Sequence, residues 1–301
     1  MRKNLIPVLL GAILLLPNAG LAADPVGMSY LKIGAGAEAT GMGEAVVSNT
    51  DGPTATYWNP GAVPLLQGLQ AAFVHNESFF DVRQEFAGIT RAIGRFGVGV
   101  SFHGVWVDNL KAYGDEPADY LGTFGYYGYA AGVSGGYRVT DVWGVGAGVQ
   151  LLREAIDVYD ASGTAFDLGI QGRGVLPRLD CGLSILHLGS SMKYIERSFL
   201  LPMTVQGGVT YHLPIPQASS EALIAVEARK IRGEDASLRL GIEYRLQNAM
   251  SLRAGYRSAL DTEDVSFGLG YRRGRIQADY SYVPFGEDLG AQHRFGIVYR
   301  R

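Results

Sequence analysis

The chain has 301 residues, of which 47% are hydrophobic and only 18% are charged, and it contains 42 glycines. Its formal charge of -3 argues against nucleic acid as a partner, because that function needs a strongly basic surface. A single cysteine, Cys181, excludes an intrachain disulfide.

Residues 1–22 have the pattern of a secretory signal peptide. Arg2 and Lys3 precede an apolar run over residues 5–16, and small residues follow it. This run is too short for a membrane helix, which needs about 20 apolar residues. Cleavage would leave 24 basic and 29 acidic residues, a formal charge of -5. We therefore expect an exported protein.

Residues 23–67 form a separate element, because they lack strand alternation and are rich in Gly, Ala and turn formers. Glycine permits turns and close backbone approach, and Pro60 stiffens a turn. A plug packed inside a barrel needs both properties, so we expect an N-terminal hatch segment; a flexible leader is the alternative. The candidate hatch glycines are Gly34, Gly36, Gly41 and Gly43.

Residues 68–301 read as about fourteen short segments with alternating apolar and polar residues. Leu240 and Ile242, for example, alternate with Arg239 and Glu243, and a strand with this period has two different faces. The pattern predicts an all-β, antiparallel transmembrane β-barrel. The predicted strands are residues 69–76, 84–92, 96–106, 123–138, 142–154, 164–174, 178–188, 202–213, 221–231, 236–247, 250–258, 264–273, 275–283 and 291–301.

A soluble β-sandwich alternates in the same way, because one face of each sheet packs on a core. The low charge content favours the barrel, since the outward face of a soluble sandwich should be rich in Lys and Glu. Many charges are Arg and lie opposite aromatic and aliphatic rows, as expected for a lumen in which charges pair across strands. The predicted lumen charges are Asp167, Arg173, Glu227, Arg229, Arg239, Glu243, Arg245, Arg253 and Arg257.

The connections between the predicted strands alternate between short and long, as in bacterial barrels with periplasmic turns and outer loops. The predicted tight turns are residues 93–95, 139–141, 175–177, 248–249 and 274. The predicted longer loops are residues 107–122, 155–163, 189–201, 259–263 and 284–290, with 214–220 long for its side. An even strand count would place both ends of the wall on the periplasmic side. An open lumen or an inserted plug is then expected, because about fourteen strands enclose more space than side chains fill.

Catalytic motifs are weak. The histidines at positions 75, 103, 187, 212 and 293 form no close ligand pair in the sequence, and Gly-x-Ser-x-Gly, HExxH and CxxC patterns are absent. A triad assembled from separate strands is the weaker alternative. We expect no enzyme activity, no metal and no cofactor.

Two motifs resemble the PorV/PorQ family of outer-membrane proteins, relatives of the FadL long-chain fatty-acid transporters. Residues 30–47 followed by Tyr57-Trp58-Asn59-Pro60 are similar to the family's amino-terminal signature, and residues 279–286 with 289–290 and 293–295 resemble its end. Gly61 and Ala62 depart from the Ala-Gly order that is usual after the proline. The predicted hatch motif is Tyr57, Trp58, Asn59, Pro60 and Gly61.

The resemblance implies a FadL-like barrel of fourteen strands in the outer membrane of a Gram-negative-type bacterium, with the amino-terminal segment as a hatch in the lumen. It implies two functions of different kinds. The first is an accessory role in protein export of the type IX secretion kind, with secreted cargo proteins and secretion components as partners. The second is a FadL-like channel for a hydrophobic small-molecule ligand. Outer-membrane lipid is a partner in both.

Overall fold

The computed structural model describes residues 25–78, 81–114, 119–194, 197–215, 220–247, 249–259, 264–286 and 290–301. The predicted signal peptide, residues 1–22, lies outside these ranges.

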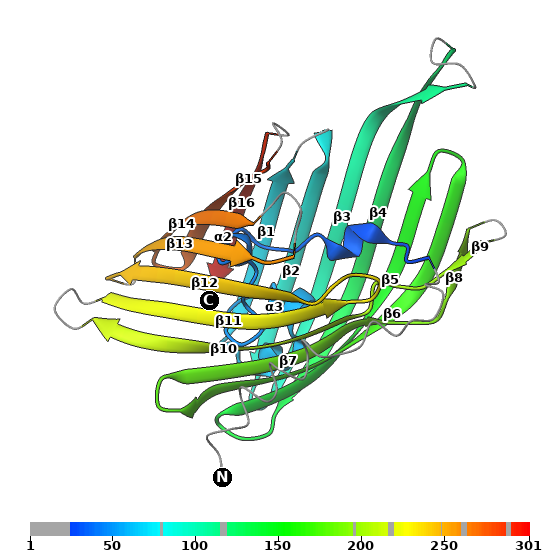
Figure 1. Ribbon diagram of the computed structural model, residues 1–301. Coiled ribbons are helices and arrows are strands. Elements are labelled where there is room, and N and C mark those ends of the chain that lie inside the picture. Colours follow the sequence, from blue (N-terminus) through cyan, green and yellow to red (C-terminus); the bar gives the residue numbers. More distant parts are fainter. Residues whose placement is uncertain are drawn as a thin grey trace.

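Fourteen of the described strands close into one antiparallel barrel, with β1 hydrogen-bonded to β16 (Figure 1). This confirms the predicted all-β barrel of about fourteen strands. Neighbours in the wall follow the chain order, except that β7 pairs directly with β10. The wall strands are β1 (Leu69–Glu77), β2 (Arg83–Ile93), β3 (Phe96–Tyr113), β4 (Tyr120–Arg138), β5 (Trp143–Ile156), β6 (Tyr159–Leu176), β7 (Leu179–Leu188), β10 (Thr204–Ile215), β11 (Ser220–Ile231), β12 (Ser237–Leu246), β13 (Met250–Arg257), β14 (Val265–Arg273), β15 (Ile276–Pro284) and β16 (Ala291–Arg300).

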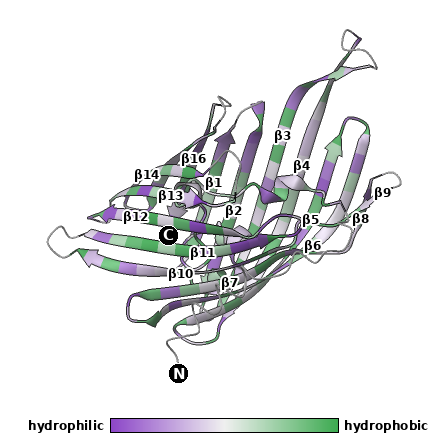
Figure 2. Ribbon diagram, in the orientation of Figure 1, coloured by the Kyte–Doolittle hydropathy of each residue, from purple (hydrophilic) through white to green (hydrophobic). Residues whose placement is uncertain are grey.

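The alternation in the sequence corresponds to the two faces of the wall. On β12, the Leu240 and Ile242 side chains are 38% and 54% exposed, whereas Arg239 and Glu243 between them are 4% and 1% exposed. Hydrophobic residues recur along the strands with polar ones between them (Figure 2). An apolar outward face with buried charges behind it is the inverse of a soluble sandwich, and it fits a wall that contacts lipid.

The barrel has a turn end and a loop end. The turn end carries the short β2–β3, β4–β5, β6–β7 and β14–β15 connections, and the chain enters β1 and leaves β16 there, with the Arg301 N–H donating to Leu69 O at 2.9 Å. The loop end is the opposite one. Short turns are typical of the periplasmic side, so the loop end faces outward.

Two predicted outer loops are wrong, because strands continue through them. Residues 107–122 belong largely to the long β3–β4 hairpin, which projects beyond the rest of the wall in Figure 1. Residues 155–163 contain only a tight turn at Asp157, which has a φ of 53°. Gly163 belongs to β6, where its missing side chain leaves room for Met192. Above the hydrocarbon layer both strand faces meet water, so the apolar alternation that reveals a strand fades.

The predicted loop at residues 189–201 contains a small hairpin outside the wall. Its strands are β8 (Met192–Tyr194) and β9 (Arg197–Phe199). Leu200, directly after β9, forms an isolated parallel bridge with Val26. The described start of the chain is therefore held at the loop end of the barrel. The predicted 214–220 connection lies mostly outside the described residues.

Residues 25–68, here called the N-terminal segment, lie inside the barrel (Figure 1). Its apolar side chains are buried in three clusters, two of which include inward-facing wall residues. No helix in the described part of the chain is long and apolar enough to cross a membrane. The helices of the segment are η1 (Ser29–Lys32), α2 (Ala37–Gly41), α3 (Ala55–Trp58) and η2 (Pro60–Leu65).

Candidate functional site

Two of the predicted glycines bring the N-terminal segment into backbone contact with the wall. A Cβ at Gly41 would lie 2.9 Å from Gly268 Cα of β14. Gly43 has a φ of 61°, and a Cβ there would lie 2.8 Å from the Tyr256 nitrogen of β13. Both wall neighbours are backbone atoms, which cannot move aside without disturbing the ladder. The segment is therefore seated on the wall at residues that must lack a side chain.

The other two predicted glycines lie earlier in the segment. Gly34 adjoins Glu44 and Trp58, and a Cβ there would lie 2.8 Å from Trp58 Cη2. Gly36 has a φ of 102° and directly precedes α2. Gly34 and Gly36 therefore allow contacts and a turn within the segment itself.

Tyr57 and Trp58 form hydrogen bonds within the segment, and Trp58 also forms one with the wall. The Tyr57 hydroxyl donates to Leu31 O at 2.9 Å, and Trp58 Nε1 donates to Ala35 O at 2.7 Å. The Trp58 carbonyl accepts from Gln206 Nε2 at 2.8 Å. These bonds hold the early and late parts of the segment together, and both side chains are buried.

Asn59 is fully buried and makes three hydrogen bonds with its side chain. Its Oδ1 accepts from the Gly61 N–H at 3.0 Å, which caps η2, while Pro60 occupies the first helical position. Its Nδ2 donates to Val47 O at 2.8 Å and to Ile170 O of β6 at 3.1 Å. A single amide thus fixes two parts of the segment and one strand of the wall.

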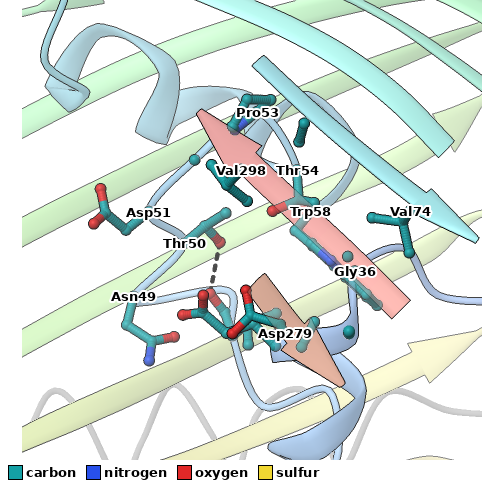
Figure 3. Close-up of a pocket in the computed structure, with 17 residues that line it drawn as sticks. Gly36, Asn49, Thr50, Asp51, Pro53, Thr54, Trp58, Val74, Asp279 and Val298 are labelled. Atoms are coloured by element: carbon teal, nitrogen blue, oxygen red, sulfur yellow. Dashed lines mark hydrogen bonds between the residues drawn. The ribbon is translucent and has the colours of Figure 1, made fainter. Parts of the chain in front are cut away.

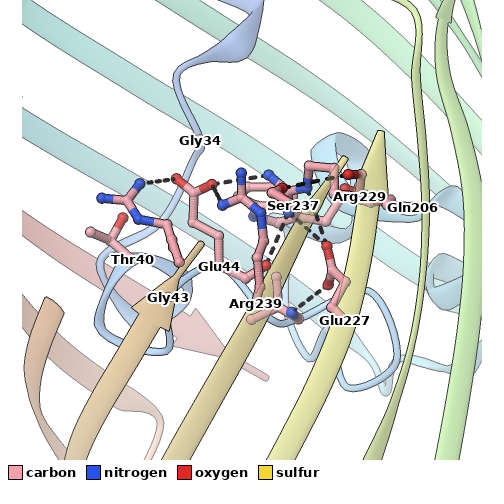
Figure 4. A network of polar contacts seen from close by, with 12 residues as sticks. Gly34, Thr40, Gly43, Glu44, Gln206, Glu227, Arg229, Ser237 and Arg239 are labelled. Atoms are coloured by element: carbon pink, nitrogen blue, oxygen red, sulfur yellow. Dashed lines mark hydrogen bonds and ion pairs between the residues drawn. The ribbon is translucent and has the colours of Figure 1, made fainter. Parts of the chain in front are cut away.

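Glu44 lies at the centre of a buried ionic cluster (Figure 4). Its Oε2 is 2.7 Å from Arg239 Nη1 and 3.0 Å from Arg229 Nη1, and its Oε1 is 3.7 Å from Arg257 Nη1. Arg229 also pairs with Glu227 at 2.8 Å. Glu227 in turn accepts two backbone N–H groups of the segment at 2.9 Å each. Three neighbouring strands therefore bind the segment at one point.

A second cluster surrounds Arg253. Its Nη2 is 2.9 Å from Glu243 Oε1 and its Nη1 is 2.8 Å from Asp279 Oδ1. Glu38 of the segment approaches Arg253 at 3.8 Å, and Arg245 pairs with Glu243 at 2.7 Å. The α2 helix, which carries Glu38, is thus bound to the wall by charge as well as by backbone contact.

The remaining predicted lumen charges, Asp167 and Arg173, lie outside these two ionic clusters. Asp167 Oδ1 accepts the His187 backbone N–H at 2.8 Å, and Gln150 donates to its other oxygen. Arg173 donates to Thr50 O at 2.9 Å and to Leu65 O at 3.1 Å, both in the N-terminal segment. All nine predicted lumen charges point inward. Several of them form ion pairs or hydrogen bonds with the N-terminal segment, in addition to the pairs that they form with one another.

The sequence reasoning missed Glu38, Glu44 and Arg294. Arg294 donates to Gly34 O at 2.5 Å and to Gln84 Oε1 at 3.0 Å. The available signal for the two carboxylates was their position among glycines and alanines, in a segment with few other charges. Within the described residues, no group of three His, Cys, Asp or Glu side chains could hold a metal ion.

The acid stability of the protein should depend on Glu44. Burial alone would raise the pKa of the Glu44 carboxyl above its ordinary 4.5, but the guanidinium groups of Arg239, Arg257 and Arg229 lower it to about 2. A lowered pKa in the folded state stabilises the fold above pH 4.5, and this stabilisation is lost as the pH falls toward 2.

We therefore expect the melting temperature of the purified protein to fall across that window, and Glu44→Gln to flatten this part of the profile. Thermal denaturation in detergent over a pH series measures both. If the melting temperatures of the wild type and Glu44→Gln fall equally with pH in this window, this account of Glu44 is contradicted.

The free space inside the barrel is unequal at its two ends. At the loop end, a cavity of about 360 Å³ lies between the segment and the wall, with Ile33, Val82, Ile231 and Phe285 among its apolar lining. The cavity that Asp279 and Thr50 line nearer the turn end has only about 40 Å³ (Figure 3). A third one, beside Arg272, has about 50 Å³. Of these three cavities among the described residues, the loop-end one has the size of small-molecule sites.

Residues 84–299 match the family model of the outer membrane protein beta-barrel domain. The chain belongs to this family. Outer membrane protein beta-barrel domains lie in the outer membrane of Gram-negative-type bacteria, which confirms the predicted location. A search of curated proteins finds no match to the chain.

Solved structures with the same fold include transport proteins. The toluene transporter TodX of Pseudomonas putida is 11% identical over 88% of this chain and 96% of its own, with a TM-score of 0.60. The CymD monoaromatic hydrocarbon channel is 11% identical over 89% and 98%, with a TM-score of 0.62. At these identities the likeness shows the fold alone.

The family model shows an outer membrane beta-barrel domain, and the two structures named above are a transporter and a channel by their descriptions. PorV/PorQ membership and the predicted export role are not shown by these comparisons. Outer-membrane lipid as the surroundings of the wall agrees with both the family and the exposed apolar face.

Proposed function

We propose that the protein is an outer-membrane channel for the uptake of hydrophobic small molecules, with the N-terminal segment acting as a hatch in its lumen. The observation that carries the proposal is the loop-end cavity of about 360 Å³, which the segment floors and in which the apolar side chains of Ile33, Val82, Ile231 and Phe285 lie among polar and charged ones. A molecule entering from outside would reach this cavity first. The fold shared with hydrocarbon channels supports the same role.

The hatch closes the path below the cavity. The two narrower cavities beneath it hold about 40 and 50 Å³, room for only a few waters. Transport therefore needs a local rearrangement of the segment, and its polar attachments at Asn59 and Glu44 are the contacts that would have to loosen. Secreted proteins are far larger than this cavity, which argues against the lumen as their path.

Uptake by whole cells tests the proposal. Cells that express the protein in the outer membrane should accumulate toluene, the hydrophobic probe, several times faster than cells with an empty vector. Glucose entry should stay at the vector level because the hatch closes the lumen. Equal toluene rates, with the folded protein present in the membrane, would contradict the channel function. Co-purification of exported proteins and secretion components would instead favour the export role.

A further inference from the structure

A row of exposed arginines, here called the basic rim, lies at the turn end of the barrel. It runs over the adjoining strands β14, β15, β16, β1, β2 and β3 and the turns between them. The wall stretches that form this part of the turn end, residues 67–72, 88–99, 270–278 and 297–301, contain no Asp or Glu. The members of the basic rim are Arg91, Arg95, Arg273, Arg275 and Arg301.

The register of the strands brings these arginines together. Arg91 pairs with Leu69 across β1 and β2, and Leu69 O accepts the Arg301 N–H at 2.9 Å, so Arg91 and Arg301 flank one residue. Arg275 O accepts the Arg300 N–H at 2.8 Å, which places the β14–β15 turn beside the end of β16. Neighbouring strands lie about 4.8 Å apart, so the positive charges follow one another closely along the rim.

The side chains of the basic rim form no ion pair and no hydrogen bond with another described residue. Arginines on the lumen side of the same end differ in this respect. Arg300 donates to Gln277 Oε1 at 2.8 Å and to Asp51 O at 3.0 Å, and Arg173 donates to Thr50 O at 2.9 Å. The protein therefore uses the lumen-side arginines itself and leaves the basic rim available to an external anion.

The basic rim begins where the apolar outer face of the wall ends. Arg91 alternates with Ile89 and Ile93, which are 49% and 59% exposed. Arg273 follows the outward-facing Tyr271, which is 51% exposed, at the end of β14. Aromatic residues on the outer face mark the membrane interface of a barrel, and long arginine side chains near that level reach the headgroups. The basic rim thus lies at the level of the lipid headgroups.

We propose that the basic rim binds the phosphate groups of anionic glycerophospholipids in the periplasmic leaflet of the outer membrane. A guanidinium group binds a phosphate through two parallel hydrogen bonds, and basic clusters at a membrane surface attract anionic lipid. The exposed apolar residues beside the arginines favour a lipid over a soluble acidic protein, because they provide a surface for acyl chains. This binding surface lies outside the lumen and does not depend on the channel function.

Native mass spectrometry of the purified protein in an uncharged detergent tests the proposal, with equimolar phosphatidylglycerol and phosphatidylcholine as the competing probes. The two lipids differ in headgroup charge, so the ratio in which they bind reports the charge preference. We expect the first lipid bound to the wild type to be phosphatidylglycerol about five times as often as phosphatidylcholine. Combining Arg91→Gln, Arg95→Gln and Arg273→Gln should lower this ratio below about twofold.

The matched control combines Arg83→Gln, Arg153→Gln and Arg178→Gln, which changes the net charge equally. Arg83 and Arg153 are exposed near the loop end, and Arg178 is exposed in the β6–β7 turn on another part of the wall. The control should keep the wild-type ratio, with both triple variants verified as folded barrels by circular dichroism. An equal loss of preference in the two would overturn the proposal, because total charge would then explain the binding. Equal binding of both lipids to the wild type would also overturn it, and would favour an acidic periplasmic protein as the occupant.

Discussion

Gly43→Ala should unseat the N-terminal segment. The new Cβ would lie 2.8 Å from Tyr256 N and 2.9 Å from Leu240 O, both backbone atoms of the wall, and the φ of 61° is unfavourable for alanine. The left-handed conformation and the overpacking together should cost about 2–4 kcal/mol. Hydrogen–deuterium exchange of residues 37–66 should rise strongly, and glucose should leak through the opened lumen.

Gly94→Ala is the matched control for this variant. Gly94 has the same φ of 61° in the β2–β3 turn, but a Cβ there meets nothing within 4 Å. It should cost about 1 kcal/mol through backbone strain alone and leave the exchange of the segment unchanged. If the two variants show equal deuterium exchange in the segment and equal glucose leakage, close packing of the segment against the wall does not seal the lumen.

Asn59→Ala should have the second large effect, because it removes three hydrogen bonds from a fully buried side chain to backbone groups. The Gly61 N–H loses its acceptor, and the carbonyls of Val47 and Ile170 lose their donor. Unpartnered buried polar groups cost about 1–3 kcal/mol each, so we expect a loss of about 2–5 kcal/mol from the seated state of the segment. Thermal denaturation in detergent and the uptake rate of the hydrophobic probe measure the result.

Asn49→Ala provides the control within the same segment. The Asn49 side-chain oxygen has no hydrogen-bond partner among the described residues, so its removal should change melting and uptake little. An Asn59→Ala protein that melts and transports like wild type would show that this amide does not hold the hatch. Changed secretion of exported proteins with unchanged uptake would point to the export role instead.

The barrel wall could be predicted from the sequence because lipid imposes a strict period of two. Arg253 and Glu243 occupy inward positions between exposed apolar neighbours, and both are buried as the alternation requires. The same rule failed for residues 107–113, where β3 extends beyond the apolar band and neither face is selected for contact with lipid. Gly163 was misread as a loop residue, although it lies within β6, whereas Asp157 does lie in the connection, which is a tight turn.

The candidate site was only partly predictable. Asn59 and Pro60 were identified through a family resemblance, the glycines through the turns and close backbone approach that they permit, and the inward charges through alternation. The contacts between the segment and the wall could not be predicted. The N-terminal segment has no periodic pattern that would place Glu44 beside Arg239 or Glu38 beside Arg253. Such contacts join residues more than 190 positions apart and depend on the three-dimensional path of the segment.

The central claim is that hydrophobic molecules cross the outer membrane through this barrel by way of its loop-end cavity. The most direct test is the initial uptake rate of the hydrophobic probe in cells that carry wild type, Gly43→Ala, Gly94→Ala or an empty vector, at matched amounts of folded protein. We predict faster uptake with wild type and Gly94→Ala than with the vector, and glucose leakage only with Gly43→Ala. Wild-type uptake at the vector level would contradict the claim.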